Sequence, residues 1–476
     1  MWHGVTYVWK WGRMVLFGNV RTVLAPSGLV RNHEAPCAGS RGTSGDRIPA
    51  QMTRNRQDRG IITDDIPTQN ADSGGVDMKL IVQLLCFLLI FAGAVPADNT
   101  QTDKKPPKGY DTTGTKIPEA KPVGTLEPVA CFFGPMPTGV TVSQDGRIFV
   151  NFPRWGDDVE FTVAEVKDGK PVAYPGAQVN KPDEQRPSET FISVQSVVVD
   201  PNNRLWILDT GRIEFGPPIA GGPKLVGVDL KSDKVFKTIT FDRSVALPDT
   251  YLNDVRFDLR RGEDGMAFIT DSSGKNPGII VVDLASGKSW RRLTNHASTK
   301  PTDSFEPLVE GRPMMVRPPN AKPSPVMVGA DGIAMGHDGQ RLYYCPLSSW
   351  ALSSVSVDAL ADENTSDEQV AATVKDEGAK VASDGLESDA EGNLYVTGYD
   401  HGAILKRSPD GEYRTLAFDP RLLWPDTLSV AADGYMYVMA NQLHRQPRFN
   451  GGVDLREKPY MLFRIKVDAK PVLLKK

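Results

Sequence analysis

The amino-acid sequence predicts an all-β fold, specifically a six-bladed β-propeller with four-stranded blades. The first observation is the stretch 384–418, which contains four short runs of β-branched and aromatic residues separated by turns that carry Gly, Asn, Asp or Pro. A single four-stranded sheet of this size cannot bury its apolar face alone, so further copies should stack beside it. The second observation is that such copies are present along the chain.

The opening of this unit recurs as a short apolar strand, a turn and an aromatic-rich strand. Aligned positions are separated by 57, 58, 78, 53 and 42 residues, and they are Gly139, Ser196, Asp254, Gly332, Gly385 and Thr427. This spacing suits propeller blades with loop insertions. The alternative is a two-sheet sandwich, but a sandwich has no reason to repeat the same unit six times.

The N-terminal part differs in composition from the rest. Residues 1–77 are rich in Arg, Gly, Ser and Asn without a sustained hydrophobic period, so we interpret them as a non-native or disordered extension. Residues 78–97 contain a positive residue, an apolar core and small residues before a cleavage point, which is the pattern of a secretory signal peptide. The apolar run is short for a membrane span. We expect a secreted protein, periplasmic or extracellular, with no integral membrane span in the mature chain.

The remaining segments follow from composition and from the repeats. Residues 98–125 are rich in Lys, Thr, Pro and Gly and should form a flexible linker before a propeller over 126–476. Residues 126–133 are predicted to close the ring by pairing beside 461–467; the alternative is that they only cap the first blade. The blades begin near residues 137, 190, 252, 329, 384 and 425. A long Pro-rich insert at 294–327 is expected to cross one rim of the ring and cover the channel.

Composition excludes several classes of protein. The net charge of −4 gives no strong basic field, so no nucleic-acid partner is expected. Four cysteines are too few for a disulfide scaffold. Cys131 and Cys345 either form a disulfide in an oxidising compartment or remain a pair of buried thiols. Neither a P-loop, a GxSxG elbow nor a His pair with zinc-ligand spacing occurs.

Six motifs together resemble the yellow/major royal jelly protein family. They are FVNFPRW (149–155), NRLWILDTG (203–211), ITDSS (269–273), DGIAM…LYYCPLSS (331–349), SDGLESDAEGNLY (383–395) and LWPDTLSVAADGYMYVMANQLHR (423–445). The resemblance implies a secreted six-bladed propeller and diverse functions: dopachrome conversion, binding of biogenic amines, and nutritive or structural roles. It implies no agreed catalytic residues. Asn203 stands where insect members often have Cys, which puts their disulfide pattern in doubt here.

The first strand of each propeller blade lines the central channel, so the residues just before these strands should converge. They include Thr138, Asn253, Asp254, Asp331, Asp384 and Asp426. Converging carboxylates raise one another's pKa unless a cation binds, and oxygen ligands suit Ca²⁺ or another divalent cation. We predict a metal site at Asn253, Asp254, Asp331 and Asp384. The alternative is that each Asp only stabilises a turn.

The same reasoning gives candidate residues for chemistry. Asp384 and Asp426 are candidate catalytic carboxylates, and His444, after an inner strand, is a candidate acid or base. Other candidates would bind a ligand at the channel mouth: Arg154, Trp155 and Asn441. The alternatives are that the histidine is a turn residue and that the tryptophans pack between blades.

Three functions remain open. The first is a secreted protein that binds a small aromatic, amine or lactone ligand at the channel mouth. The second is an enzyme: a metal-dependent lactonase, as the carboxylates distantly resemble gluconolactonase/paraoxonase-like propellers, or a dopachrome-type tautomerase. Against the lactonase, the first blade has no Glu at Pro137, Thr138 or Gly139, where those enzymes place one. The third is a non-catalytic structural envelope protein.

Overall fold

The computed structural model describes residues 9–10, 13–14 and 121–476. The predicted signal peptide at 78–97, the linker up to residue 120 and almost all of the predicted extension at 1–77 lie outside the described residues. Two short strands in the extension, β1 (Trp9–Lys10) and β2 (Arg13–Met14), pair antiparallel. Among the described residues, no helix is long and apolar enough to cross a membrane.

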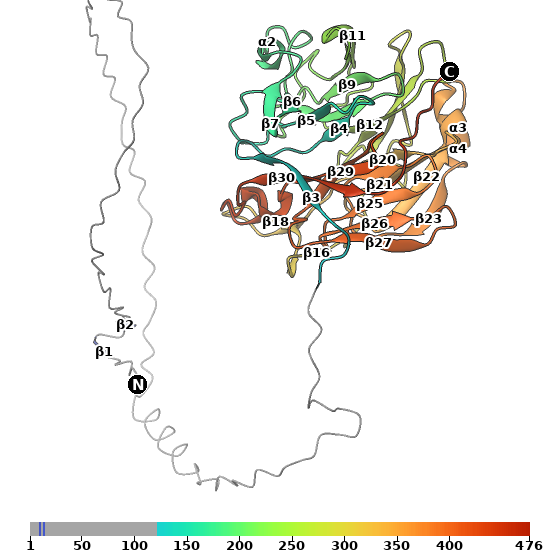
Figure 1. Ribbon diagram of the computed structural model, residues 1–476. Helices are drawn as coiled ribbons and strands as arrows, with labels where there is room; N and C mark the ends of the chain where they lie inside the picture. Colours follow the sequence, from blue (N-terminus) through green and yellow to red (C-terminus); the bar gives the residue numbers. More distant parts are fainter. Residues whose placement is uncertain (1–8, 11–12, 15–120) are drawn as a thin grey trace, which may run out of the picture. The chain divides into compact units, whose positions relative to one another are not determined.

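Residues 121–476 form six four-stranded antiparallel sheets arranged in a ring, which confirms the predicted six-bladed β-propeller (Figure 1). The first three blades are β4 (Val140–Val142), β5 (Ile148–Asn151), β6 (Val163–Lys167) and β7 (Lys170–Ala173); β8 (Val194–Val199), β9 (Arg204–Asp209), β10 (Lys224–Asp229) and β11 (Lys234–Thr240); and β12 (Leu252–Asp258), β13 (Met266–Asp271), β14 (Gly278–Asp283) and β15 (Ser289–Arg292). The next two are β20 (Ala330–Met335), β21 (Arg341–Pro346), β22 (Ala351–Ser356) and β23 (Lys375–Ala379); and β24 (Leu386–Ser388), β25 (Leu394–Gly398), β26 (Ala403–Arg407) and β27 (Tyr413–Phe418). Short helices lie between strands: α2 (Ala177–Asn180), α3 (Val357–Ala361), α4 (Asp367–Ala371), η1 (Leu443–Arg445) and η2 (Pro447–Phe449).

The last blade is completed by the first strand of the propeller. It contains β28 (Pro425–Val430), β29 (Tyr435–Ala440), β30 (Tyr460–Lys466) and then β3 (Glu127–Phe132). The antiparallel register joins Phe132 to Tyr460 and Pro128 to Phe463. The predicted closing strand is therefore confirmed, and the alternative of a strand that only caps the first blade is excluded.

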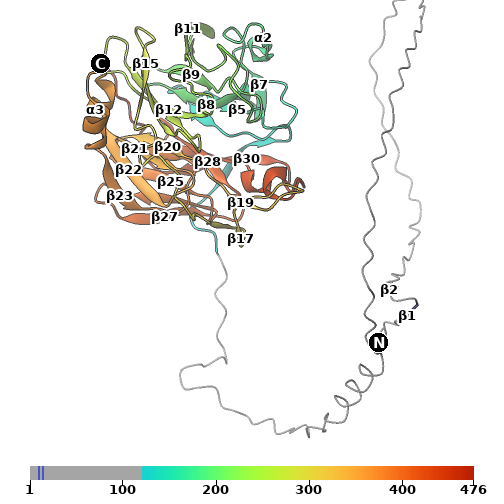
Figure 2. The ribbon, with the colours of Figure 1, turned by 180° about the vertical axis from the view of Figure 1, so that it is seen from behind.

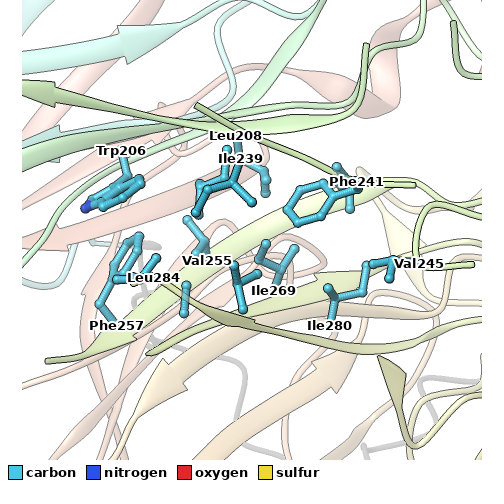
Figure 3. Close-up of a cluster of buried hydrophobic side chains, with 14 of the residues drawn as sticks. Trp206, Leu208, Ile239, Phe241, Val245, Val255, Phe257, Ile269, Ile280 and Leu284 are labelled. Atoms are coloured by element: carbon cyan, nitrogen blue, oxygen red, sulfur yellow. The ribbon is translucent and has the colours of Figure 1, made fainter. Parts of the chain in front are cut away.

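Apolar side chains between neighbouring blades hold the ring together. Between the second and third blades, Trp206 stacks on Phe257 with ring centroids 5.5 Å apart, and Leu208, Val255 and Ile280 pack beside them (Figure 3). The Trp206 indole N–H donates to Asp200 at 2.8 Å, so its one polar atom is also satisfied. Burial of one such side chain stabilises the folded state by roughly 1.5–3 kcal/mol. Every blade packs against a neighbour on each of its two faces, so these contributions recur around the ring.

The inner strands approach one another so closely that two positions require glycine. A Cβ on Gly332 would lie 2.3 Å from the carbonyl oxygen of Asp384, and a Cβ on Gly385 would lie 2.2 Å from that of Asp426. Each of these glycines directly follows the aspartate of its own repeat, Asp331 or Asp384, and packs against the backbone of the aspartate in the next repeat. The recurring Asp-Gly pair therefore has a packing cause for the glycine, and it leaves the aspartate side chain on the channel.

The two ends of the channel are covered by different segments. The insert forms the hairpins β16 (Leu308–Val309)–β17 (Arg312–Pro313) and β18 (Met315–Val316)–β19 (Ser324–Pro325). Val309 and Met314 from this insert pack with Trp424, so the predicted insert does cover one end. The C-terminal residues 471–473 line the other end, and both ribbon views place the C-terminus and these hairpins on opposite sides of the ring (Figures 1 and 2).

The two cysteines of the propeller are not joined. Cys131 lies on β3 and is exposed, whereas Cys345 lies on β21 and is buried, and both thiols are free. Burial raises the pKa of the Cys345 thiol, which keeps it in its unreactive protonated form. The structure therefore shows thiols and no disulfide, and of the two predicted buried thiols only Cys345 is buried.

Candidate functional site

A cavity of about 260 Å³ lies under the insert, where the first strands of the blades begin. Its floor is polar and its walls are aromatic and aliphatic. The side chains used in the argument below are Trp155, Phe215, Tyr251, Asn253, Asp331, Asp384, Trp424, Asp426 and Arg448. Four of these were predicted from the position of the inner strands: Asn253, Asp331, Asp384 and Asp426.

Three buried aspartates form the floor of the cavity. Asp331, Asp384 and Asp426 expose only 5%, 8% and 5% of their surface. Each accepts a hydrogen bond from a neutral protein group. The donors are the Asn253 amide to Asp331 at 2.6 Å, the Trp424 indole to Asp384 at 2.7 Å and the Asn441 amide to Asp426 at 2.5 Å.

Burial sets the protonation of this floor. Desolvation raises the pKa of Asp384 to about 6, against the opposing effect of the hydrogen bonds from Trp424 and Asp331. Desolvation and the neighbouring Asp384 carboxylate raise the pKa values of Asp331 and Asp426 well above the usual range. Carboxyl groups that cannot all ionise share protons. The cavity floor therefore consists of three carboxyl groups whose pKa values are all raised.

Asp254 is placed differently from the other three aspartates. Its carboxylate pairs with the Arg256 guanidinium at 2.9 Å and accepts a hydrogen bond from Ser196 at 2.7 Å. Arg256 also lies 3.6 Å from Glu387. Asp254 does not line the cavity, so the structure does not bring the predicted set of Asn253, Asp254, Asp331 and Asp384 together as one group.

The fit of a divalent cation can be tested on the donors present. The three floor carboxyls are oxygen donors of the right chemistry for Ca²⁺. Each, however, already accepts a hydrogen bond from Asn253, Trp424 or Asn441. Across residues 121–476 no group of three or more Asp, Glu, His or Cys residues has the arrangement of a metal site. Calcium binding stays a prediction.

His444 lies behind the cavity wall and does not line the cavity. Its ring stacks on Trp424 with centroids 5.8 Å apart, and its Nε2 lies 2.7 Å from the Glu310 carboxylate of the insert. Burial lowers the pKa of His444, against the raising effect of Glu310. Arg445 and His444 together hold the pKa of Glu310 at about 2. The predicted acid or base is therefore placed to fasten the insert to the last blade.

The predicted ligand-binding residues separate into one on the cavity and two beside it. Trp155 lines the cavity. Arg154 instead donates to the backbone carbonyls of Ile192 at 2.9 Å and Asn180 at 3.2 Å, and also to that of Val159. Asn441 is buried and orients the Asp426 carboxyl. Arg154 therefore shapes a loop, and Asn441 supports the floor from behind.

Of the aromatic side chains on one wall of the cavity, the sequence analysis named Trp155 but neither Phe215 nor Tyr251. Trp155 stacks on Phe215 with centroids 5.7 Å apart and an interplanar angle of 26°, and Tyr251 lies 6.0 Å from Phe215. The Trp155 indole donates to the Tyr251 hydroxyl at 2.7 Å. Tyr251 directly precedes the inner strand β12. Residues in this position were predicted to converge on the channel, so the same argument could have identified Tyr251. Phe215 lies in a loop without periodicity, and no sequence signal marked it.

The comparisons with known proteins agree with the fold. Residues 192–471 match the family model described as major royal jelly protein. The chain is similar to the yellow-related salivary protein LJM17 of Lutzomyia longipalpis, with 28% identity over 254 residues that cover 48% of this chain and 58% of that protein. It is also similar to major royal jelly protein 1 of Apis mellifera, with 26% identity over 224 residues that cover 44% of this chain and 48% of that protein.

A third curated relative is an enzyme, the dopaminechrome tautomerase of Drosophila melanogaster, with 26% identity over 170 residues covering 34% of this chain and 36% of that protein. The chain thus spans about half the length, or less, of these curated relatives. Among solved structures, a luciferin-regenerating enzyme is 12% identical with a TM-score of 0.47, covering 74% of this chain and 100% of that one. A regucalcin from Agrobacterium tumefaciens is 14% identical with a TM-score of 0.46, covering 73% and 95%. The family match extends over more than half of the sequence, and the chain belongs to the major royal jelly protein family.

Proposed function

We propose that this protein is a secreted propeller that binds a small aromatic molecule in the cavity under the insert. One observation carries the proposal: a cavity of about 260 Å³ has stacked aromatic rings on its wall and buried carboxyl groups on its floor. Typical small-molecule pockets have about 300–1,000 Å³, so this one suits a ligand with one or two rings. Apolar walls with a few convergent polar groups are the usual composition of such sites.

The shape of the wall supports a flat ligand. Trp155 and Phe215 are stacked, and the Trp155–Tyr251 hydrogen bond fixes the orientation of both of those side chains. An aromatic ring that packs against such a wall gains about 0.5–1.5 kcal/mol beyond its area burial. The Asp384 carboxyl on the floor offers a hydrogen-bond partner to a polar substituent on the ligand ring.

Secretion is supported by two independent features. Residues 78–97 have the pattern of a signal peptide. Two relatives carry names from secreted fluids, saliva and royal jelly. We place the protein outside the cytoplasm on this basis, and detection of the processed chain in culture medium or periplasm tests it.

Binding is tested by titrating the full chain with phenols, catechols, indoles and small lactones by isothermal calorimetry. A saturable heat with at least one aromatic probe is expected, and it should be lost in Trp155→Leu. Trp290→Leu is the matched control, because Trp290 lies on β15 and hydrogen-bonds to the Leu360 carbonyl away from the cavity. Absence of binding to every probe would leave the structural envelope protein as the better account.

A second candidate is an enzyme that moves a proton on the bound ligand. The observation that favours it is Asp384, a cavity carboxyl whose pKa of about 6 suits proton exchange near neutral pH. A tautomerase acting on a dopachrome-type ring would need such a group, and one relative is a dopaminechrome tautomerase. A metal-dependent lactonase would in addition need the cation. Turnover that is lost in Asp384→Asn, while ligand binding persists, would support the enzyme.

A further inference from the structure

Arg448 places a positive charge at the aromatic edge of the cavity. It lies on the short helix η2 and lines the cavity. Its guanidinium carbon lies 4.4 Å from the ring centroid of Phe215 and 5.0 Å from that of Phe449. Because Trp155 stacks on the Phe215 ring as well, the guanidinium extends the aromatic wall as one more planar group.

The hydrogen-bond donors of Arg448 are unused within residues 121–476. Its polar contact within these residues is at the backbone, where the Arg448 carbonyl accepts from the Arg317 N–H at 2.8 Å. Arg212, the other arginine on the cavity, has its donors occupied by the backbone carbonyls of Gly216 at 2.6 Å, Phe215 at 3.2 Å and Thr250. A guanidinium has five N–H donors in a planar fork that matches a carboxylate. Of the two arginines, only Arg448 has this fork available to a ligand.

The opposite end of the cavity has the complementary property. The floor carboxyl groups of Asp331, Asp384 and Asp426 are oxygen acceptors, and each already accepts one hydrogen bond from a neutral side chain. A carboxyl group has further acceptor capacity, so the floor can receive a hydrogen bond from a ligand hydroxyl. Asp249 also lines the cavity, and its carboxylate accepts from the Asn276 amide at 3.0 Å. The cavity therefore offers unpartnered N–H donors at Arg448 and carboxyl oxygens at the inner strands.

We propose that the site selects aromatic carboxylates, with the ligand carboxylate on Arg448, the ring against Trp155 and Phe215, and a hydroxyl group on the floor aspartates. This inference rests on the proposed function, because it assigns a ligand class to the same cavity. It reverses the preference for a cationic ligand that the acidic residues of the cavity would suggest, because the N–H donors of Arg448 face the cavity without a partner among residues 121–476.

Three probes with one ring separate the possibilities: 4-hydroxyphenylacetate, 4-ethylphenol and tyramine share the phenol and differ only in a carboxylate, neutral or ammonium tail. We expect the full chain to bind 4-hydroxyphenylacetate about tenfold or more tightly than 4-ethylphenol, the gain of a charge-assisted hydrogen bond. Tyramine should bind no better than 4-ethylphenol. Arg448→Met keeps a long apolar side chain over Phe215 and should abolish the preference for the carboxylate, so that 4-hydroxyphenylacetate then binds no more tightly than 4-ethylphenol.

Arg312→Met is the matched control, because Arg312 lies on the same insert-covered side but does not line the cavity. It should leave all three affinities unchanged. Equal binding of the three probes, or an equal loss of all three in Arg448→Met, would overturn the assignment of the carboxylate to Arg448. Tighter binding of tyramine would show that the floor aspartates act as anions. Failure of all three probes in the unmodified chain would count against the proposed function itself, a result distinct from loss of selectivity.

Discussion

The buried carboxyl groups along the channel differ in their partners between its two ends. Towards the end lined by the C-terminal residues, Arg256 lies 3.6 Å from Glu387, and it also pairs with Asp254 at 2.9 Å. At the end covered by the insert, Asp331, Asp384 and Asp426 accept their hydrogen bonds from neutral donors. A buried carboxyl group that is paired with a cation stabilises the scaffold, whereas one without such a pair is placed to meet a ligand. The difference separates scaffold from site within one ring of strands.

The largest effect is expected when Arg256, the cation shared by Asp254 and Glu387, is removed. Arg256→Met should lower the free energy of unfolding by about 3–5 kcal/mol, because it leaves Asp254 and Glu387 buried without their cation. Urea unfolding at pH 7 followed by circular dichroism measures this. Arg421→Met is the control, since Arg421 is 52% exposed and pairs with Asp419 at the surface. A loss of under about 1 kcal/mol would mean that the two ends are not different in the way described.

A smaller effect of opposite sign is expected at the cavity end. The pKa of Asp384 is raised to about 6 in the folded protein from 3.8, so the folded state binds more protons between these values and stability falls as pH rises through them. Asp384→Asn cannot ionise. Relative to the unmodified chain, it should gain up to about 3 kcal/mol of unfolding free energy between pH 4 and pH 7. A pH series of urea unfolding curves checks this.

Asp254→Asn is the counterpart of that experiment at the other end. Because it removes a charge that Arg256 compensates, it should destabilise the protein at pH 7. Should both Asn variants change stability in the same direction, the contrast between the two ends would be lost.

A third prediction concerns the fastening of the insert. Glu310→Gln weakens the contact with His444 and Arg445, which lie 2.7 Å and 2.5 Å from the Glu310 carboxylate. Glu310 is 41% exposed, so solvent screening limits the loss of stability to about 1 kcal/mol or less. Its pKa is lowered to about 2, so this contribution is present above the ordinary value of 4.5 and is lost as pH falls through 2. We expect faster exchange of a bound aromatic probe in stopped-flow measurements, with little change in the unfolding midpoint. Unchanged exchange would mean that the insert does not control access.

The smallest expected effect is that of calcium. A cation on the floor must displace protons from Asp331, Asp384 and Asp426, so its stabilisation should be larger at pH 8 than at pH 6. Thermal unfolding with calcium and with chelator at both pH values measures this. A shift at pH 8 that disappears in Asp384→Ala would support the predicted metal site. The absence of a shift at both pH values would leave proton sharing as the account of the floor.

The sequence predicted the architecture because propeller repeats are local. Each blade carries its own turns and alternating strands, so the Asp-Gly pairs at 331–332 and 384–385 marked the inner strands directly. Ring closure by β3 was predictable for the same reason, since a closed ring leaves one strand of the last blade to be supplied. These features depend on short spans of sequence and on a rule about where inner strands begin.

The chemistry of the site was harder to predict because it depends on contacts between distant segments. Asp254 differs from Asp384 in having a cation as its partner. This difference is due to the single residue Arg256, which lies two positions after Asp254 on the same strand. Phe215 lies in an irregular loop and Arg448 on the short helix η2; they are far apart in sequence and meet only in the folded ring. His444 was placed on the correct side of the ring, but the Trp424 ring separates it from the cavity.

The closing strand also has a consequence for how the chain is made. Strand β3 leaves the ribosome before any blade exists, and its partner β30 is synthesised last. The last sheet therefore forms through a contact between opposite ends of the propeller, the kind of long-range pairing that slows folding. Until then β3 presents an unpaired edge that invites pairing with another chain. The same delay keeps the propeller ring open until its last strand has been synthesised.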